Sequence, residues 1–216
     1  MIELLLEKGY GVLTQSIALF TIMNSISAGA IMLTLVPETI ARKDLKLIAR
    51  RNTRAVFVSM LILFLIGIYI FQFFGISPMA LRVFGGLILL FMGINMVQGH
   101  DKKLNASQRE RDAAMDKDDI SIVPLAIPII IGPGLATSLI TFQLEATTWV
   151  DYFVTIIAIV VVTIANYIVL ANMNYIKVRL GLNGIKVLNR IMGLVVGSLA
   201  VQMIVQGLQE LWKYFA

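Results

Sequence analysis

Six stretches of the chain contain no charged residue and no histidine. They are 11–37, 55–81, 83–98, 121–144, 152–176 and 191–209. A helix of about 20 apolar residues crosses the hydrocarbon core of a bilayer, and each stretch reaches that length with a few flanking residues. The third does so if its helix begins near Pro78. The pattern therefore predicts an all-α, multi-pass protein of the cell membrane with six transmembrane helices.

Composition supports a membrane protein and argues against a soluble one. Hydrophobic residues make up 58% of the 216 positions, against about 45–50% in soluble domains. Charged residues make up 14%, too few to cover the surface of so apolar a soluble core. The isoelectric point of about 9.6 reflects Lys and Arg clusters between the apolar stretches. We therefore expect contact with the lipid bilayer and no nucleic acid partner.

The distribution of Lys and Arg predicts how the chain is oriented. The loops expected at 38–54, 99–120 and 174–190 hold fifteen of the 18, and the opposite side holds Lys8, Arg82 and Lys213. Cytoplasmic loops carry an excess of Lys and Arg, so both termini are predicted to face outside. Aromatic residues gather near the outside ends, where such rings anchor at the membrane surface: Tyr10, Phe73, Phe74, Trp149, Tyr152, Trp212 and Tyr214.

The two halves of the chain resemble each other weakly. A shift of 108 positions aligns the third and sixth apolar stretches without a gap and superposes several identical residues: Arg82 on Arg190, Gly85 on Gly193, Val97 on Val205, Gln98 on Gln206 and Gly99 on Gly207. Each half holds three spans, so the second half enters from the opposite side. We expect a first repeat at 1–98, a cytoplasmic linker at 99–120 and a second, inverted repeat at 121–216. Secondary transporters are commonly built in this way.

The fourth stretch carries the strongest signal for a broken helix. It contains Pro124, Pro128 and Pro133, and Pro133 lies between Gly132 and Gly134. Proline removes a backbone donor and clashes with the preceding turn, and glycine has a low helix propensity. Pro133 is also well suited to the first position of a new helix. A break near Pro133 is therefore predicted.

The same shift places Asn24, Ser25 and Ile26 on the glycine–proline–glycine break. Asn24, Ser25 and Ser27 are all good N-caps for a second half-helix running toward Pro37. We therefore expect the first and fourth helices to be discontinuous at equivalent positions.

Two broken helices that enter from opposite faces would bring free backbone ends to the middle of the membrane. N-terminal amides attract a carboxylate and C-terminal carbonyls attract an ammonium group, so a small zwitterion fits without a charged side chain. One break alone is more often a packing kink, but two at equivalent positions favour a substrate site. The candidate residues are Asn24, Ser25, Ser27, Pro128, Gly132, Pro133, Gly134 and Thr137.

Other chemistry finds little support in the sequence. There is no cysteine, and the apolar stretches hold no His, Asp or Glu for acid–base or nucleophilic work, so an enzyme is not expected. No cofactor or metal site is predicted, and no nucleotide-binding motif is present. Coupling to Na⁺ or H⁺ remains open, as do the oligomeric state and the direction of transport. Gly193 and Gly197 are expected to pack against another helix, and Asn166 to bond a neighbouring one.

At these motifs the sequence resembles the MarC family, whose characterised members include small neutral amino acid transporters of the SnatA kind. The resemblance is carried by Pro124-Leu-Ala-Ile-Pro128 with Gly132-Pro-Gly134, and by Phe74-Gly-Ile-Ser77 leading into Leu81-Arg-Val-Phe-Gly-Gly86. The first break departs from the family's Asn-Pro-x-Gly, because Ser25 and Ser27 replace the proline and glycine. The resemblance implies alternating-access transport of glycine- or alanine-sized amino acids. The alternative is a channel, or an exporter for another small solute.

Overall fold

The computed structural model describes residues 2–36, 40–99 and 131–215, and these ranges contain helices and no strand. In the described part of the chain, five apolar segments are long enough to cross a membrane, and Lys8–Thr34 is the first of them. The expected linker at 99–120, apart from Gly99, and the first half of the expected fourth span lie outside these ranges. The helices are α1 (Ile2–Met23), α2 (Ser25–Leu35), α3 (Arg42–Phe73), α4 (Pro78–Gln98), α6 (Pro133–Glu145), α7 (Trp149–Ala171) and α8 (Met173–Phe215).

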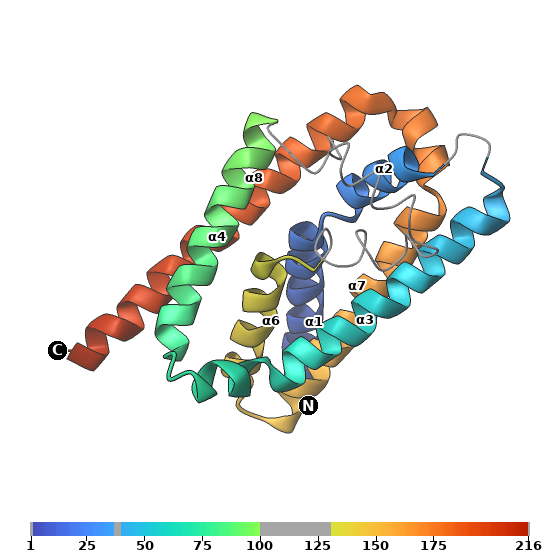
Figure 1. Ribbon diagram of the computed structural model, residues 1–216. Helices are drawn as coiled ribbons and strands as arrows, with labels where there is room; N and C mark the ends of the chain where they lie inside the picture. The colour runs from blue at the N-terminus through green and yellow to red at the C-terminus, as the bar shows by residue number, and fades with distance from the viewer. Residues whose placement is uncertain (1, 37–39, 100–130, 216) are drawn as a thin grey trace.

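The helices form three groups (Figure 1). α4 lies along α8 on one side, α3 packs with α7 on the other, and α1 and the short α6 lie between these pairs. Large apolar side chains on the outer helices face away from the protein, among them Phe84, Phe91 and Leu194, which are 62%, 66% and 61% exposed. So much exposed apolar surface indicates contact with lipid. The chain is an integral membrane protein.

α4 and α8 touch through their backbones because small residues face each other. A Cβ added at Gly93 of α4 would lie 2.8 Å from the backbone nitrogen of Gly197 and 2.9 Å from the carbonyl oxygen of Gly193. A Cβ added at Gly193 would lie 2.9 Å from the carbonyl oxygen of Gly93. In a bilayer, close backbone approach of this kind is a main source of helix–helix attraction. The packing predicted at Gly193 and Gly197 is confirmed.

The sequence pattern predicted that the basic segments are loops, and for two of them this prediction is wrong. The segment 38–54 is helical from Arg42 onward, where it begins α3. The segment 174–190 lies within α8 and is interrupted only at Gly181, which has φ +65°. Lys and Arg favour helix, and their long side chains can carry the charge out of the apolar layer. The charged residues that end these apolar stretches therefore do not end the helices.

Several polar side chains within the spans form hydrogen bonds to a neighbouring helix or to their own backbone. Asn166 of α7 donates to the Oδ1 atom of Asn52 of α3 at 3.3 Å, and both side chains are fully buried. This confirms the expected contact between helices. Thr34 and Thr163 donate to carbonyl oxygens of their own helices at 2.8 and 2.6 Å, which leaves neither hydroxyl unpaired in an apolar layer.

Candidate substrate site

The first helix is broken at Asn24, between α1 and α2. Asn24 adopts the left-handed conformation (φ 48°, ψ 53°), which Asn tolerates better than most residues. Its Oδ1 atom accepts a hydrogen bond from the backbone nitrogen of Ser27 at 3.4 Å and so caps α2. Of the three caps that the sequence offered, the structure uses Asn24, while Ser25 and Ser27 lie within α2 with no exposed surface.

The second break lies at the start of α6. Gly132 is the N-cap, in an extended conformation, and Pro133 occupies the first turn as predicted. A Cβ added at Gly134 would lie 2.5 Å from Cδ2 of Leu89 on α4 and 3.8 Å from Cγ2 of Ile22 on α1. Glycine at 134 therefore allows the beginning of α6 to pack against α4, close to the end of α1. Pro128 lies outside the described residues.

The structure brings the two breaks together. Ile22 lies two residues before Asn24, and it is a neighbour of the Gly134 position on α6. Among the described residues, Nδ2 of Asn24 and Oγ of Ser25 are buried without a hydrogen-bond partner. Buried polar atoms are normally paired, so each unpaired one requires an explanation such as a ligand or an ordered water. The broken region thus offers one free donor and one free hydroxyl.

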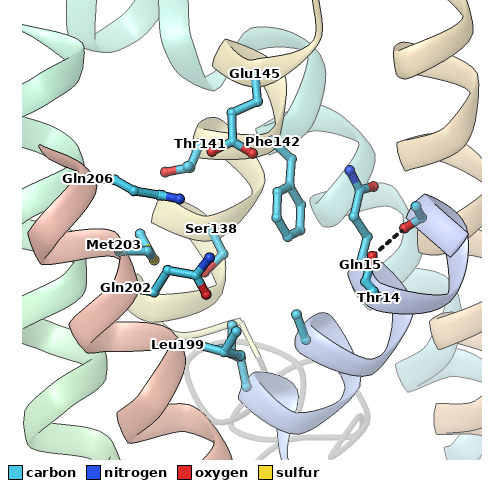
Figure 2. A pocket seen from close by; sticks show the side chains of 13 residues that line it. Thr14, Gln15, Ser138, Thr141, Phe142, Glu145, Leu199, Gln202, Met203 and Gln206 are labelled. Atoms are coloured by element: carbon cyan, nitrogen blue, oxygen red, sulfur yellow. Dashed lines mark hydrogen bonds between the residues drawn. The ribbon is translucent and has the colours of Figure 1, made fainter. Parts of the chain in front are cut away.

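A pocket of about 290 Å³ adjoins the breaks and lies between α1, α6 and α8 (Figure 2). Its lining runs from Ile22 and Ser138, near the breaks, to Gly11 in the middle of α1 and Glu145 at the last residue of α6. Figure 2 shows side chains from all three helices gathered around this space. The polar lining residues are Thr14, Gln15, Ser138, Thr141, Glu145, Gln202 and Gln206.

None of the lining residues was among the site residues predicted from the sequence, although a periodic signal exists. Ser138, Thr141 and Glu145 follow each other at helical spacing, which puts them on one face of α6. Gln202 and Gln206 are likewise one turn apart on α8. Thr137, which was predicted as a site residue, packs against α4 instead. A Cβ added at Gly85 of α4 would lie 2.6 Å from the Cβ of Thr137. Its hydroxyl donates to the carbonyl oxygen of Pro133 at 2.8 Å.

Charged residues gather at the end of the pocket that lies away from the breaks, which we call its outer end. Arg82 of α4 is buried, with only 8% of its side chain exposed, and it forms ion pairs with Glu145 of α6 and Glu210 of α8. Lys8 of α1 pairs with Asp151 of α7 at 2.6 Å. Within the described ranges, no group of three His, Cys, Asp or Glu side chains could hold a metal ion. The pocket therefore has an uncharged polar wall and one ionised end.

Comparison with known proteins gives a consistent result. Residues 11–212 match the model of the MarC family, described as integral membrane proteins. A UPF0056 membrane protein of Methanocaldococcus jannaschii is 34% identical over 192 residues, which cover 89% of this chain and 93% of that protein. The UPF0056 membrane protein YvbG of Bacillus subtilis is 30% identical over 197 residues, which cover 91% of this chain and 93% of YvbG. No solved structure matches the chain significantly.

The family match covers most of the chain, including both helix breaks and every residue that lines the pocket. The apolar helices, the breaks and the family match agree with one another. The chain belongs to the MarC family of integral membrane proteins.

Proposed function

We propose that this protein is a secondary transporter of small neutral amino acids, of the glycine and alanine class, working by alternating access. The observation that carries the proposal is a polar pocket that leads to two adjoining helix breaks. Half-helix N-termini carry about half a positive charge and unpaired amides, which suits a substrate carboxylate. The free Nδ2 atom of Asn24 adds a further donor beside it.

We expect six spans arranged as an inverted repeat, an arrangement suited to alternating access. The N-caps of α2 and α6 are Asn24 and Gly132, 108 positions apart. α2 and α6 run in opposite directions from the breaks (Figure 1). Arg82 in the first repeat and Arg190 in the second are also 108 positions apart. Each lies near the end of a helix of the other repeat. Arg82 pairs with Glu210 near the end of α8, and Arg190 lies near Gly99 at the end of α4. Rocking of such repeats around a central site would expose it to each side in turn.

The size and lining of the site predict selectivity. In proteoliposomes, glycine and alanine, and to a lesser extent serine, should compete for uptake of labelled glycine, whereas leucine, phenylalanine, lysine and glutamate should not. A charged side chain would lie among apolar and amide groups at the breaks without a partner, which costs several kcal/mol. Competition by lysine or glutamate equal to that by alanine would contradict the proposed site.

The same assay separates a carrier from a channel or an exporter for another solute. A carrier saturates with substrate and shows counterflow, because unlabelled substrate on one side accelerates exchange of label from the other. A channel shows neither. Imposed Na⁺ and H⁺ gradients, applied one at a time, would identify the coupling ion. Flux that does not saturate and shows no counterflow would reject the carrier.

Orientation is tested separately. Both chain ends lie toward the same end of the helices (Figure 1), and the basic starts of α3 and α8 lie at the other. The positive-inside rule therefore predicts outside termini. The chain has no cysteine, so Asn105→Cys and Ala216→Cys each provide one thiol. In intact cells a membrane-impermeant thiol reagent should label only Ala216→Cys. Labelling of Asn105→Cys alone would overturn the topology and the inverted repeat.

A further inference from the structure

We infer that the outer end of the pocket is a separate entry station that binds the ammonium group of a small zwitterion, with Glu145, Thr141 and Gln15 as its acceptors. This inference rests on the proposed function for the identity of the ligand. All three residues line the pocket between α1, α6 and α8. Figure 2 shows Thr141 and Glu145 on α6 and Gln15 facing the pocket from α1.

Charge at this end of the pocket favours a cation. Arg82 is shared between Glu145 and Glu210, so the three side chains together carry a net charge of −1 in their usual ionised forms. Glu145 is also the last residue of α6, where the helix dipole adds partial negative charge. Two carboxylates and a helix C-terminus therefore face one guanidinium. A second cationic group would bring the net charge of this cluster to zero. Of the two carboxylates, Glu145 lines the pocket and Glu210 does not.

Unpaired acceptors point to the same kind of ligand. Thr141 is only 4% exposed, and its Oγ1 atom has no hydrogen-bond partner among the described residues. The Oε1 atom of Gln15 is likewise buried without a partner. An ammonium group has three N–H donors and no acceptor. Glu145, Thr141 and Gln15 all line one pocket, and their side chains carry the kinds of acceptor that such donors bond.

The other carboxylate nearby is already satisfied, which singles out Glu145. Asp151 lies in a smaller pocket of about 170 Å³ that shares Gln15 and Glu145 with the first. It accepts from Nζ of Lys8 at 2.6 Å, from the backbone nitrogen of Thr148 at 2.9 Å and from Oγ1 of Thr148 at 2.8 Å. The bond from the backbone nitrogen of Thr148 is half of the capping box of α7, and the other half is the bond from the backbone nitrogen of Asp151 to Oγ1 of Thr148. Asp151 therefore acts as a structural cap.

The station is distinct from the site at the breaks. Gly134 and Glu145 are eleven residues apart on α6, which corresponds to about 16 Å along a helix. A glycine or alanine molecule is far too short to touch both ends. The zwitterion would therefore bind first at Glu145 by its ammonium group and then move inward past Ser138 to the breaks. A charge at a pocket entrance acts mainly by raising the local concentration and the association rate of its ligand.

Transport kinetics test the role of Glu145. Glu145→Gln should raise the KM for glycine applied from outside by about tenfold, with little change in maximal rate or in the KM from inside. Glu145→Asp keeps the charge, so its KM for glycine applied from outside should stay close to that of the wild type. Glu210→Gln is the matched control, because Glu210 also pairs with Arg82 but does not line the pocket. Its effect should be much smaller than that of Glu145→Gln.

Thiol labelling provides a readout that does not depend on transport. Thr14→Cys would place a single thiol in the pocket lining. An ammonium-bearing thiol reagent should react faster there than a sulfonate-bearing one, and Glu145→Gln should reduce that preference about tenfold. Methylammonium should slow the labelling, whereas lactate should not. If no amino acid is transported, the proposed function fails, and this measurement alone still decides the ammonium station.

Three results would overturn the inference. Equal effects of Glu145→Gln and Glu210→Gln in both measurements would mean that Glu145 serves only as a partner of Arg82. Loss of Na⁺ stimulation in Glu145→Gln with an unchanged KM for glycine would assign the carboxylate to a coupling cation. A thiol at position 14 that shows no preference between the two reagents would mean that the pocket does not attract cations.

Discussion

Gly93→Val is expected to prevent formation of stable, monodisperse protein, because α4 and α8 touch at this position through their backbones. The added Cβ would lie 2.8 Å from the backbone nitrogen of Gly197 and 2.9 Å from the carbonyl oxygen of Gly193. Neither atom can rotate away as a side chain can, so the helices must separate. Overpacking of this kind costs about 1–3 kcal/mol for a small group and more for a branched one. The measurement is the yield and thermal stability of purified protein.

Gly197→Val is the matched control within the same glycine pair. A Cβ added at Gly197 meets no atom within 4 Å, because its direction points away from α4. Gly197 itself contacts Gly93 only through its backbone, so a side chain there leaves the contact intact. Valine at 197 should therefore leave the folded yield and thermal stability close to those of the wild type, since valine has a higher helix propensity than glycine. Equal loss of folded yield for the two variants would show that the α4–α8 contact differs from the one described.

The second large effect is expected at Asn24, where Asn24→Ala should abolish transport. Alanine in the left-handed conformation costs roughly 1–2 kcal/mol, and loss of the cap on Ser27 costs about 1 kcal/mol more. Both penalties disappear if α1 continues straight into α2, so the break should close and displace α2 from its position. Flux in proteoliposomes should fall to background while the protein still inserts as a helical membrane protein.

Asn24→Gly separates the geometry of the break from the chemistry of the side chain. Glycine adopts φ 48° without strain, so the break should persist and the thermal stability should stay close to that of the wild type. The Nδ2 donor, unpaired and buried in this structure, would be lost. A hydrogen bond to a charged group contributes about 1.5–3 kcal/mol, so affinity for glycine should fall by roughly 10- to 150-fold. Wild-type transport by Asn24→Gly would mean that Asn24 only shapes the helix, and wild-type transport by Asn24→Ala would mean that no break is needed.

Much of the site's framework was predictable from local rules. Pro133 between two glycines predicted the start of α6, and a run of short polar residues predicted the interruption after Met23. Which polar residue would cap α2 was not predictable, because Asn24, Ser25 and Ser27 all have suitable side chains. The choice of Asn24 follows from its tolerance of a left-handed conformation, which a serine adopts less readily.

The pocket itself was not predicted, because its walls come from helices far apart in sequence. Gln15 lies on α1, Thr141 on α6 and Gln206 on α8, and nothing local indicates that they share a space. Thr137 and Ser138 are neighbours with similar side chains, yet Thr137 packs against Gly85 while Ser138 lines the pocket. The rotation of α6 about its axis decides between them, and contacts along the helix, such as Gly134 with Leu89 and Ile140 with Gly67, hold that rotation.

Apolar stretches, glycine and proline positions and the placement of basic residues are local properties, and they determined that this chain is a helical membrane protein with interrupted helices. They do so because a bilayer forces each spanning segment to satisfy its own backbone hydrogen bonds, so that each span can be recognised from its local sequence. The tertiary structure alone decided how α1, α6 and α8 face each other, and hence which polar atoms remain unpaired. It also decided that Arg82 is shared by Glu145 and Glu210, since an ion pair between distant helices depends on packing and leaves no local pattern.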